Sequence, residues 1–173
     1  MTQTTKTAVG AVAALVILLG AAWVFKPSLF QRSGAADNQS AAVVALLSAP
    51  EGSFDFGTIS MTAGKVTHKY ALKNSGSSPV NVTKLFTSCM CTQASIATQN
   101  DRRGPFGMQG HGGSIPKINL EIKPGETAEV EAVYDPAAHG PAGVGKVRRV
   151  VYVETDSSET PEIQLSFEAN VTP

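Results

Sequence analysis

The chain has 173 residues, in which 14 Lys and Arg balance 14 Asp and Glu, and it contains two cysteines. Zero net charge excludes a polybasic nucleic-acid binder, and an apolar content of 42% excludes wholesale disorder. Two cysteines are too few for a disulfide-stapled scaffold or a four-cysteine zinc site. The length predicts one domain of ordinary size with little chain left for a second.

An apolar run without charge occupies residues 8–25, between Lys6 and Lys26. As a helix it would span about 27 Å at ~1.5 Å per residue, close to the ~30 Å hydrocarbon core of a bilayer. It predicts a single-pass transmembrane anchor within residues 1–26, with the C-terminal domain extracytoplasmic because almost nothing precedes the helix. The alternative is a cleaved signal peptide, for which Gly20 and Ala22 supply small residues, although the run exceeds the usual signal core of ~7–15 residues.

Residues 27–50 change composition to Ala, Ser, Gln, Asn and Gly, which predicts a linker. An apolar patch at residues 41–47 is compatible with a first strand, a short helix or a continued stalk. The folded domain is expected over residues 51–173, which hold 11 basic and 13 acidic side chains.

This C-terminal part alternates apolar and polar residues at period two, with Gly, Pro, Asn and Ser at the interruptions. About seven short strands without an amphipathic helix between them predict an all-β protein, an antiparallel β-sandwich. The clearest stripes are Val66, His68, Tyr70 and Leu72; Ile118, Leu120 and Ile122; Val130, Ala132 and Tyr134; Val147, Arg149, Val151 and Val153; and Leu165, Phe167, Ala169 and Val171.

Four short motifs occur in a distinctive order: Phe56-Gly57-Thr58-Ile59, Asn74-Ser75-Gly76, Thr87-Ser88-Cys89-Met90-Cys91-Thr92 and Lys123-Pro124-Gly125-Glu126. Over roughly residues 50–173 the chain thereby resembles the domain-of-unknown-function 1573 family, bacterial membrane-anchored or secreted domains with a Ser-Cys-x-Cys-Thr motif. The resemblance implies an immunoglobulin-like sandwich related to Hydin-type modules, and no agreed activity. The chain departs from the family pattern at Met90, where Gly is usual, and in an inserted loop at residues 99–116.

Cys89 and Cys91 are two positions apart. On an extended strand their side chains would share one face, with Cα atoms about 6.5–7 Å apart, the upper limit for a disulfide. A disulfide between them therefore requires a local kink, and two thiolates on one face suit a soft metal better. Pairing with each other, a metal, another molecule or burial as free thiols all remain open.

Two glycine- and proline-containing loops supply further soft or borderline ligands. Met108 and His111 lie in the inserted loop, and His139 lies in residues 135–141. Thiolate, thioether and imidazole together favour copper, or zinc without the thioether. The hypothesis is a copper site of Cys89, Cys91, His111 and His139, with Met108 as a further ligand.

Plainer roles compete with each of these ligands. His139 could be a polar surface residue, Met108 could fill the edge of the core, and the thiols could be a redox pair. His68 lies on an apolar strand face and is expected to be a core or rim histidine.

No phosphate-binding, hydrolase or zinc-protease motif occurs, so we expect no enzyme. The pairs Arg102-Arg103 and Arg148-Arg149 are expected to be solvated edges and not a nucleic-acid site. Two classes of function remain. One is a copper-binding protein tethered to the membrane by its N-terminal helix, and the other is a structural module that holds an envelope protein partner.

Overall fold

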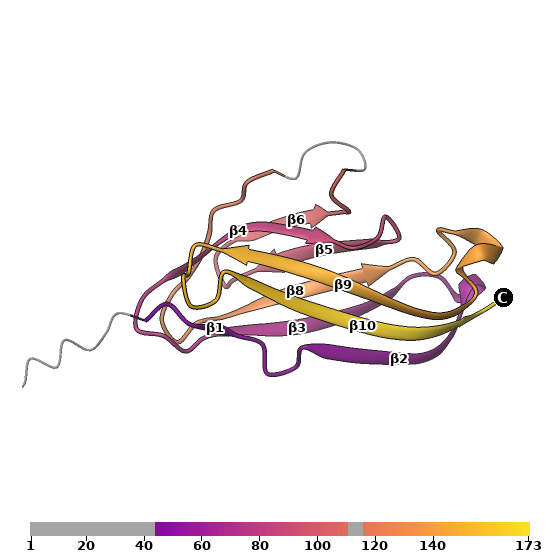
Figure 1. Cartoon of the computed structure of the whole chain (residues 1–173), viewed down its shortest axis with the longest axis horizontal. Coiled ribbons are helices and arrows are strands. Elements are labelled where there is room, and N and C mark those ends of the chain that lie inside the picture. Colours follow the sequence, from indigo (N-terminus) through magenta and orange to yellow (C-terminus); the bar gives the residue numbers. More distant parts are fainter. Residues whose placement is uncertain (1–43, 111–115) are drawn as a thin grey trace, which may run out of the picture. The chain divides into compact units, whose positions relative to one another are not determined.

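The computed structural model describes residues 44–110 and 116–173, and these form two five-stranded β-sheets (Figure 1). The strands are β1 (Leu47–Ser48), β2 (Ser53–Ser60), β3 (Val66–Asn74), β4 (Val80–Thr87), β5 (Thr92–Ala97), β6 (Arg102–Phe106), β7 (Leu120–Ile122), β8 (Thr127–Tyr134), β9 (Gly145–Thr155) and β10 (Glu162–Thr172). Two short 3-10 turns are η1 (Met61–Ala63) and η2 (Gly140–Gly143). No helix of these described residues is long and apolar enough to cross a membrane, and the predicted anchor at residues 8–25 lies outside them.

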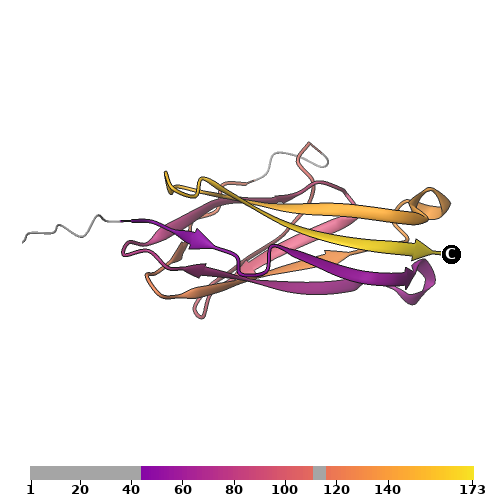
Figure 2. The same cartoon turned by 60° about the horizontal axis from the view of Figure 1, so that its bottom comes forward.

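One sheet has the strand order β1-β3-β8-β5-β6, and the other has the order β2-β10-β9-β4-β7. All pairs are antiparallel except β2, which runs parallel to β10 (Figure 2). Strand β4 belongs to one sheet and β5 to the other, so the segment between them crosses the sandwich at its end. This crossing segment contains both cysteines.

The period-two stripes face each other and form one core. Tyr70 on β3, Val130 on β8 and Phe167 on β10 are each at most 1% exposed. The Tyr70 hydroxyl donates a hydrogen bond of 2.8 Å to the carbonyl of Ser166, which ties the first sheet to the second. This hydrogen bond satisfies the buried hydroxyl of Tyr70, while its ring fills the core.

The Asn-Ser-Gly turn signal is confirmed at the end of β3. Asn74 is fully buried, and its Nδ2 donates to the carbonyls of Ser78 at 2.8 Å and Ile122 at 2.9 Å. Its Oδ1 accepts from the backbone N–H of Gly76 at 3.0 Å. One side chain therefore fixes the turn before β4 and the neighbouring end of β7.

The predicted β-sandwich and all-β class are confirmed, but the estimate of about seven strands was low. Strand β5 has buried side chains on both faces, so it lacks the alternation that the prediction required. Strand β6 lies inside the segment that was predicted to be an inserted loop, residues 99–116, and it pairs with β5. Part of the apolar patch forms β1, which pairs with β3.

Candidate functional site

The cysteines lie in a tight turn, which corrects the expectation of an extended strand. Cys89 accepts a backbone hydrogen bond of 3.1 Å from Thr92, and its Cα lies 5.2 Å from that of Cys91. Thr87 fixes the turn, because its buried hydroxyl bonds the carbonyls of Cys89 at 2.9 Å and Thr92 at 3.0 Å. The shorter Cα spacing lies well inside the range that a disulfide needs.

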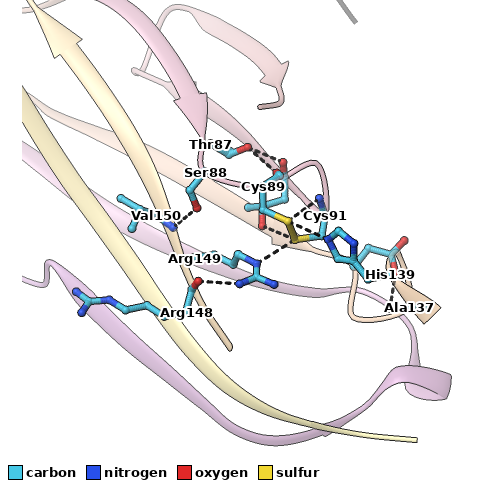
Figure 3. Close-up of a disulfide and its surroundings, with 11 residues drawn as sticks. Thr87, Ser88, Cys89, Cys91, Ala137, His139, Arg148, Arg149 and Val150 are labelled. Atoms are coloured by element: carbon cyan, nitrogen blue, oxygen red, sulfur yellow. Dashed lines mark hydrogen bonds between the residues drawn. A yellow bond between two sulfur atoms is a disulfide. The ribbon is translucent and has the colours of Figure 1, made fainter. Parts of the chain in front are cut away.

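Cys89 and Cys91 form a disulfide (Figure 3), and no free cysteine exists in the described residues, which include both cysteines of the chain. The copper hypothesis assumed two open thiolates on one strand face. Because both sulfurs are bonded to each other, neither offers a thiolate, and the structure does not support the copper site in this state.

His139 lies against the first sulfur. Its Nε2 is 3.2 Å from Sγ of Cys89, and the side chain is otherwise exposed (Figure 3). Asp135 holds the loop beside the cysteine turn, because its N–H donates to the carbonyl of Cys91 at 2.9 Å and its Oδ1 accepts from the N–H of Ala137 at 3.0 Å. A Cβ built on buried Gly143 would lie 3.3 Å from Cβ of His139, so η2 packs closely behind the imidazole.

Arg149 lies against the second sulfur, and sequence reasoning missed it. Its Nε donates to Sγ of Cys91 at 3.1 Å, and its Nη1 donates to the carbonyl of Arg148 at 2.9 Å (Figure 3). The sequence had been interpreted as a solvated arginine pair, and this is wrong for Arg149. Its place in the apolar stripe of β9, between Val147 and Val151, was the available signal, since a charge on a core-facing row requires a partner.

The backbone of β4 and β9 brings Arg149 to this position. Ser88 continues the pairing of the two strands, because its N–H donates to the carbonyl of Val150 at 2.9 Å. Its hydroxyl also accepts from the N–H of Val150 at 2.9 Å. The next residue of each strand, Cys89 and Arg149, then faces the end of the sandwich.

Tyr134 reports the electrostatics of this region. Burial raises the pKa of its hydroxyl, while the positive charge of Arg149 opposes the increase and the negative charge of Asp135 adds to it. The hydroxyl of Tyr134 therefore lies within the electrostatic influence of both the Arg149 guanidinium and the Asp135 carboxylate beside the disulfide.

Of the five predicted ligands, the structure brings together Cys89, Cys91 and His139. One donor atom from each of these three lies within 4.8 Å of the other two. The backbone of Met108 forms a bridge with Thr87, two residues before Cys89, and His111 lies outside the described residues. His68 packs with aromatic rings, stacked on Phe54 at 3.7 Å between ring centres, as expected for a rim histidine.

Two packed sheets whose ends are joined by a two-cysteine turn define a β-sandwich domain with a Cys-x-Cys disulfide. Residues 47–105 match the model of the family described as "Protein of unknown function (DUF1573)", and this confirms the family that the sequence predicts. The matched segment contains the Asn74 turn and the cysteine turn. No curated protein matches the chain.

Solved structures resemble the fold at low sequence identity. A protein of unknown function from Porphyromonas gingivalis W83 aligns with a TM-score of 0.54 and 15% identity over 75% of this chain and 48% of its own. The seventh ASH/PapD-like domain of human CEP192 aligns with a TM-score of 0.45 and 13% identity, over 75% of this chain and 87% of its own. The secreted serine protease VesC from Vibrio cholerae aligns with a TM-score of 0.44 and 14% identity, over 77% of this chain and 25% of its own. The chain thus spans about half of the Porphyromonas gingivalis protein and a quarter of VesC, and the likeness concerns the fold alone.

Proposed function

We propose that the protein is a thiol–disulfide carrier, an immunoglobulin-like domain whose Cys89–Cys91 pair alternates between disulfide and dithiol. The observation that supports this proposal is the placement of a basic side chain on each sulfur. Nε2 of His139 is 3.2 Å from Sγ of Cys89, and Nε of Arg149 is 3.1 Å from Sγ of Cys91. Cationic neighbours stabilise thiolates, which are the reactive form of cysteine.

A purely structural disulfide is a weaker explanation. The stabilisation that a disulfide gives through the unfolded chain grows with the loop that it closes. A loop of three residues gives about 1.6 kcal/mol in this model, roughly half of the ~3 kcal/mol for 15 residues. The turn is also fixed independently by the hydroxyl of Thr87, so the covalent bond adds little to its geometry.

The carrier reaction conserves atoms and electrons when the partner is a dithiol. One partner thiolate attacks a sulfur of the pair, and a mixed disulfide forms as the Cys89–Cys91 bond breaks. The second partner thiolate then attacks the partner's own sulfur in the mixed disulfide. The partner is oxidised to a disulfide, this pair gains two electrons, and the two protons of the partner's thiols end on Cys89 and Cys91.

We place the domain at the cell envelope, as an extracytoplasmic, single-pass membrane protein. The apolar run at residues 8–25 supports the anchor, and a disulfide suits an oxidising compartment. The pair acts stoichiometrically with an envelope protein partner, so the carrier is not an enzyme with a substrate pocket of its own.

The test is reversible reduction of the folded, full-length chain. The chain is equilibrated with buffers of reduced and oxidised glutathione, its thiols are alkylated, and the dithiol fraction is read by mass spectrometry. We expect one two-electron transition that is the same from both directions, with the far-ultraviolet circular dichroism of the β-sheets unchanged. A disulfide that is reduced only when the protein unfolds would overturn the proposal and leave a structural or partner-holding module.

A second candidate function is soft-metal binding by the reduced pair. The donor atoms of Cys89, Cys91 and His139 lie within 4.8 Å of one another, and two thiolates with an imidazole suit copper(I) better than harder ions. Reduced full-length chain titrated with copper(I) against a chromogenic chelator should bind one equivalent, and the oxidised chain none. Retention of copper by Cys89→Ser/Cys91→Ser would exclude this site.

A further inference from the structure

Arg149 differs from the other arginines of the described residues in its partner. Arg102, Arg103 and Arg148 each pair with a carboxylate, from Glu131, Asp101 and Glu168 respectively. Among the described residues, Arg149 forms no ion pair with a carboxylate. Its Nε instead donates to Sγ of Cys91, and its Nη1 to the carbonyl of Arg148.

This arrangement leaves a permanent positive charge in contact with a neutral sulfur. Arg149 is half-buried on the core-facing row of β9, where a charge without a counter-charge is costly. If the disulfide opens with the electron pair on Cys91, the new thiolate supplies that counter-charge at the same place. The sulfur whose thiolate is better stabilised is the better leaving group in thiol–disulfide exchange.

The other sulfur lies on the more accessible side. Cys89 is 9% exposed and Cys91 is 3% exposed, and the exposed side chain of His139 lies beside Cys89. Cys91 borders a recess of about 100 Å³ lined in part by Lys65, Gln93 and Asp135. That volume corresponds to about three water molecules, so the recess admits little more than a single small side chain.

We infer that the two cysteines have different roles, with Cys89 forming the mixed disulfide with the partner and Cys91 departing as a thiolate held by Arg149. This inference rests on the proposed function and specifies which sulfur is attacked and which sulfur leaves. The partner thiolate attacks Sγ of Cys89, the Cys89–Cys91 bond breaks, and the electron pair moves to Sγ of Cys91. The second thiolate of the dithiol polypeptide then releases Cys89 and completes the two-electron transfer.

The first experiment identifies the sulfur that carries the mixed disulfide. Oxidised full-length chain reacts briefly with reduced glutathione, and excess N-ethylmaleimide is then added to trap the thiol that has been set free. Tandem mass spectrometry then locates both adducts in the peptide. We expect glutathione on Cys89 and maleimide on Cys91, in about tenfold excess over the reverse isomer, because one leaving group is stabilised by charge. Equal amounts, or glutathione mainly on Cys91, would overturn the inference.

The second experiment measures the contribution of Arg149. We expect Arg149→Gln to slow the opening of the disulfide by glutathione about tenfold, and Arg149→Lys to restore part of the rate, since both depend on the charge beside the leaving sulfur. Arg148→Gln is the matched control, because the neighbouring side chain points outward to Glu168 at 3.9 Å. Equal rates for the two glutamine variants would overturn the role of Arg149, provided that both keep their melting temperatures.

These results separate the inference from the proposed function. A disulfide that glutathione cannot open in the folded protein contradicts the carrier itself. Reversible opening with the reverse adduct pattern is compatible with the carrier function and contradicts only the roles assigned to Cys89 and Cys91. In that case the partner thiolate attacks Cys91 from the recess beside it. If Arg149→Gln does not fold, Arg149→Lys and the adduct pattern of the unaltered chain still decide.

Discussion

Arg149 and Cys91, 58 positions apart in the sequence, are joined by a hydrogen bond of 3.1 Å from Nε to Sγ. The contact depends on two strands that bring their ends together, β4 before the cysteine turn and β9 beside it. It does not require the covalent bond, because either a disulfide sulfur or a thiolate can accept from the guanidinium. The fold around the sulfurs should therefore persist when the disulfide opens.

Reduction should change stability only slightly. We expect the free energy of unfolding of the full-length chain to fall by about 2 kcal/mol or less on reduction, because the disulfide closes a loop of only three residues. Urea unfolding with and without a dithiol measures the difference, and Cys89→Ser/Cys91→Ser serves as a control that should not respond to the dithiol. Unfolding of the reduced chain without urea would contradict this expectation.

Asn74→Ala should be strongly destabilising. The substitution leaves the carbonyls of Ser78 and Ile122 and the N–H of Gly76 without their side-chain partner. Because the site is buried, we expect a loss of about 3 kcal/mol in the free energy of unfolding, measured by urea denaturation. Asn81→Ala is the matched control, since the Asn81 side chain bonds Asp156 at the exposed surface and its removal should cost less than about 1 kcal/mol. A loss of less than about 1 kcal/mol for Asn74→Ala, as small as that of the control, would contradict a stabilising role of the hydrogen bonds of Asn74.

Local patterns explain which parts of this fold could be predicted. Strands β3, β8 and β10 each have one buried face, so their alternation is visible in the sequence. Strand β5 has no such pattern because both of its faces are covered. The turn at Asn74 has a local signal, but the hydrogen bond from its side chain to Ile122 joins positions that only the folded chain brings together.

The candidate site was predicted only in part, because some of its contacts have local sequence signals and others form only in the folded chain. The spacing of Cys89 and Cys91 indicated a related pair, and His139 was one of its predicted neighbours. The kink that joins the sulfurs depends on the hydroxyl of Thr87, whose two acceptors are set by the tertiary turn. The role of Arg149 depends on which face of β9 points inward, and counting adjacent arginines does not reveal this.

Gly76→Ala should release β1 from the sheet. A Cβ on Gly76 would lie 2.0 Å from the carbonyl oxygen of Val44 and 2.7 Å from the backbone nitrogen of Leu46, and neither backbone atom can move alone. The displacement should break the hydrogen bonds that Ser75 and Ser77 donate to the same segment. Hydrogen–deuterium exchange of residues 44–48 should therefore become faster, while exchange in the core strands changes little.

Gly52→Ala is the matched control for this prediction. No atom lies within 4 Å of a Cβ built there, apart from chain neighbours, so exchange in residues 44–48 should stay as in the unaltered chain. Unchanged exchange in Gly76→Ala itself would contradict the close approach of β1 to the turn.

Tyr70 should make the fold sensitive to alkaline pH. Burial, together with the negative charge of Glu51, raises the pKa of its hydroxyl far above the ordinary value of 10.0. In the unfolded chain this hydroxyl ionises near pH 10, whereas in the folded chain it stays neutral, so stability is complete below about pH 10 and falls as pH rises further. Unfolding free energies of Cys89→Ser/Cys91→Ser between about pH 8 and 11 measure the slope without disulfide chemistry.

Tyr70→Phe in the same background identifies the group responsible. The substitution removes the hydrogen bond to the carbonyl of Ser166, so we expect a loss of about 1 kcal/mol at pH 8. Above pH 10 the unfolded variant has no hydroxyl to ionise at this position, so its stability should fall less steeply with pH than that of the parent. The two curves should converge as pH rises, because the parent loses a contribution that the variant never had. Parallel curves would show that the Tyr70 hydroxyl ionises with the same pKa in the folded and the unfolded chain, and would contradict the raised pKa.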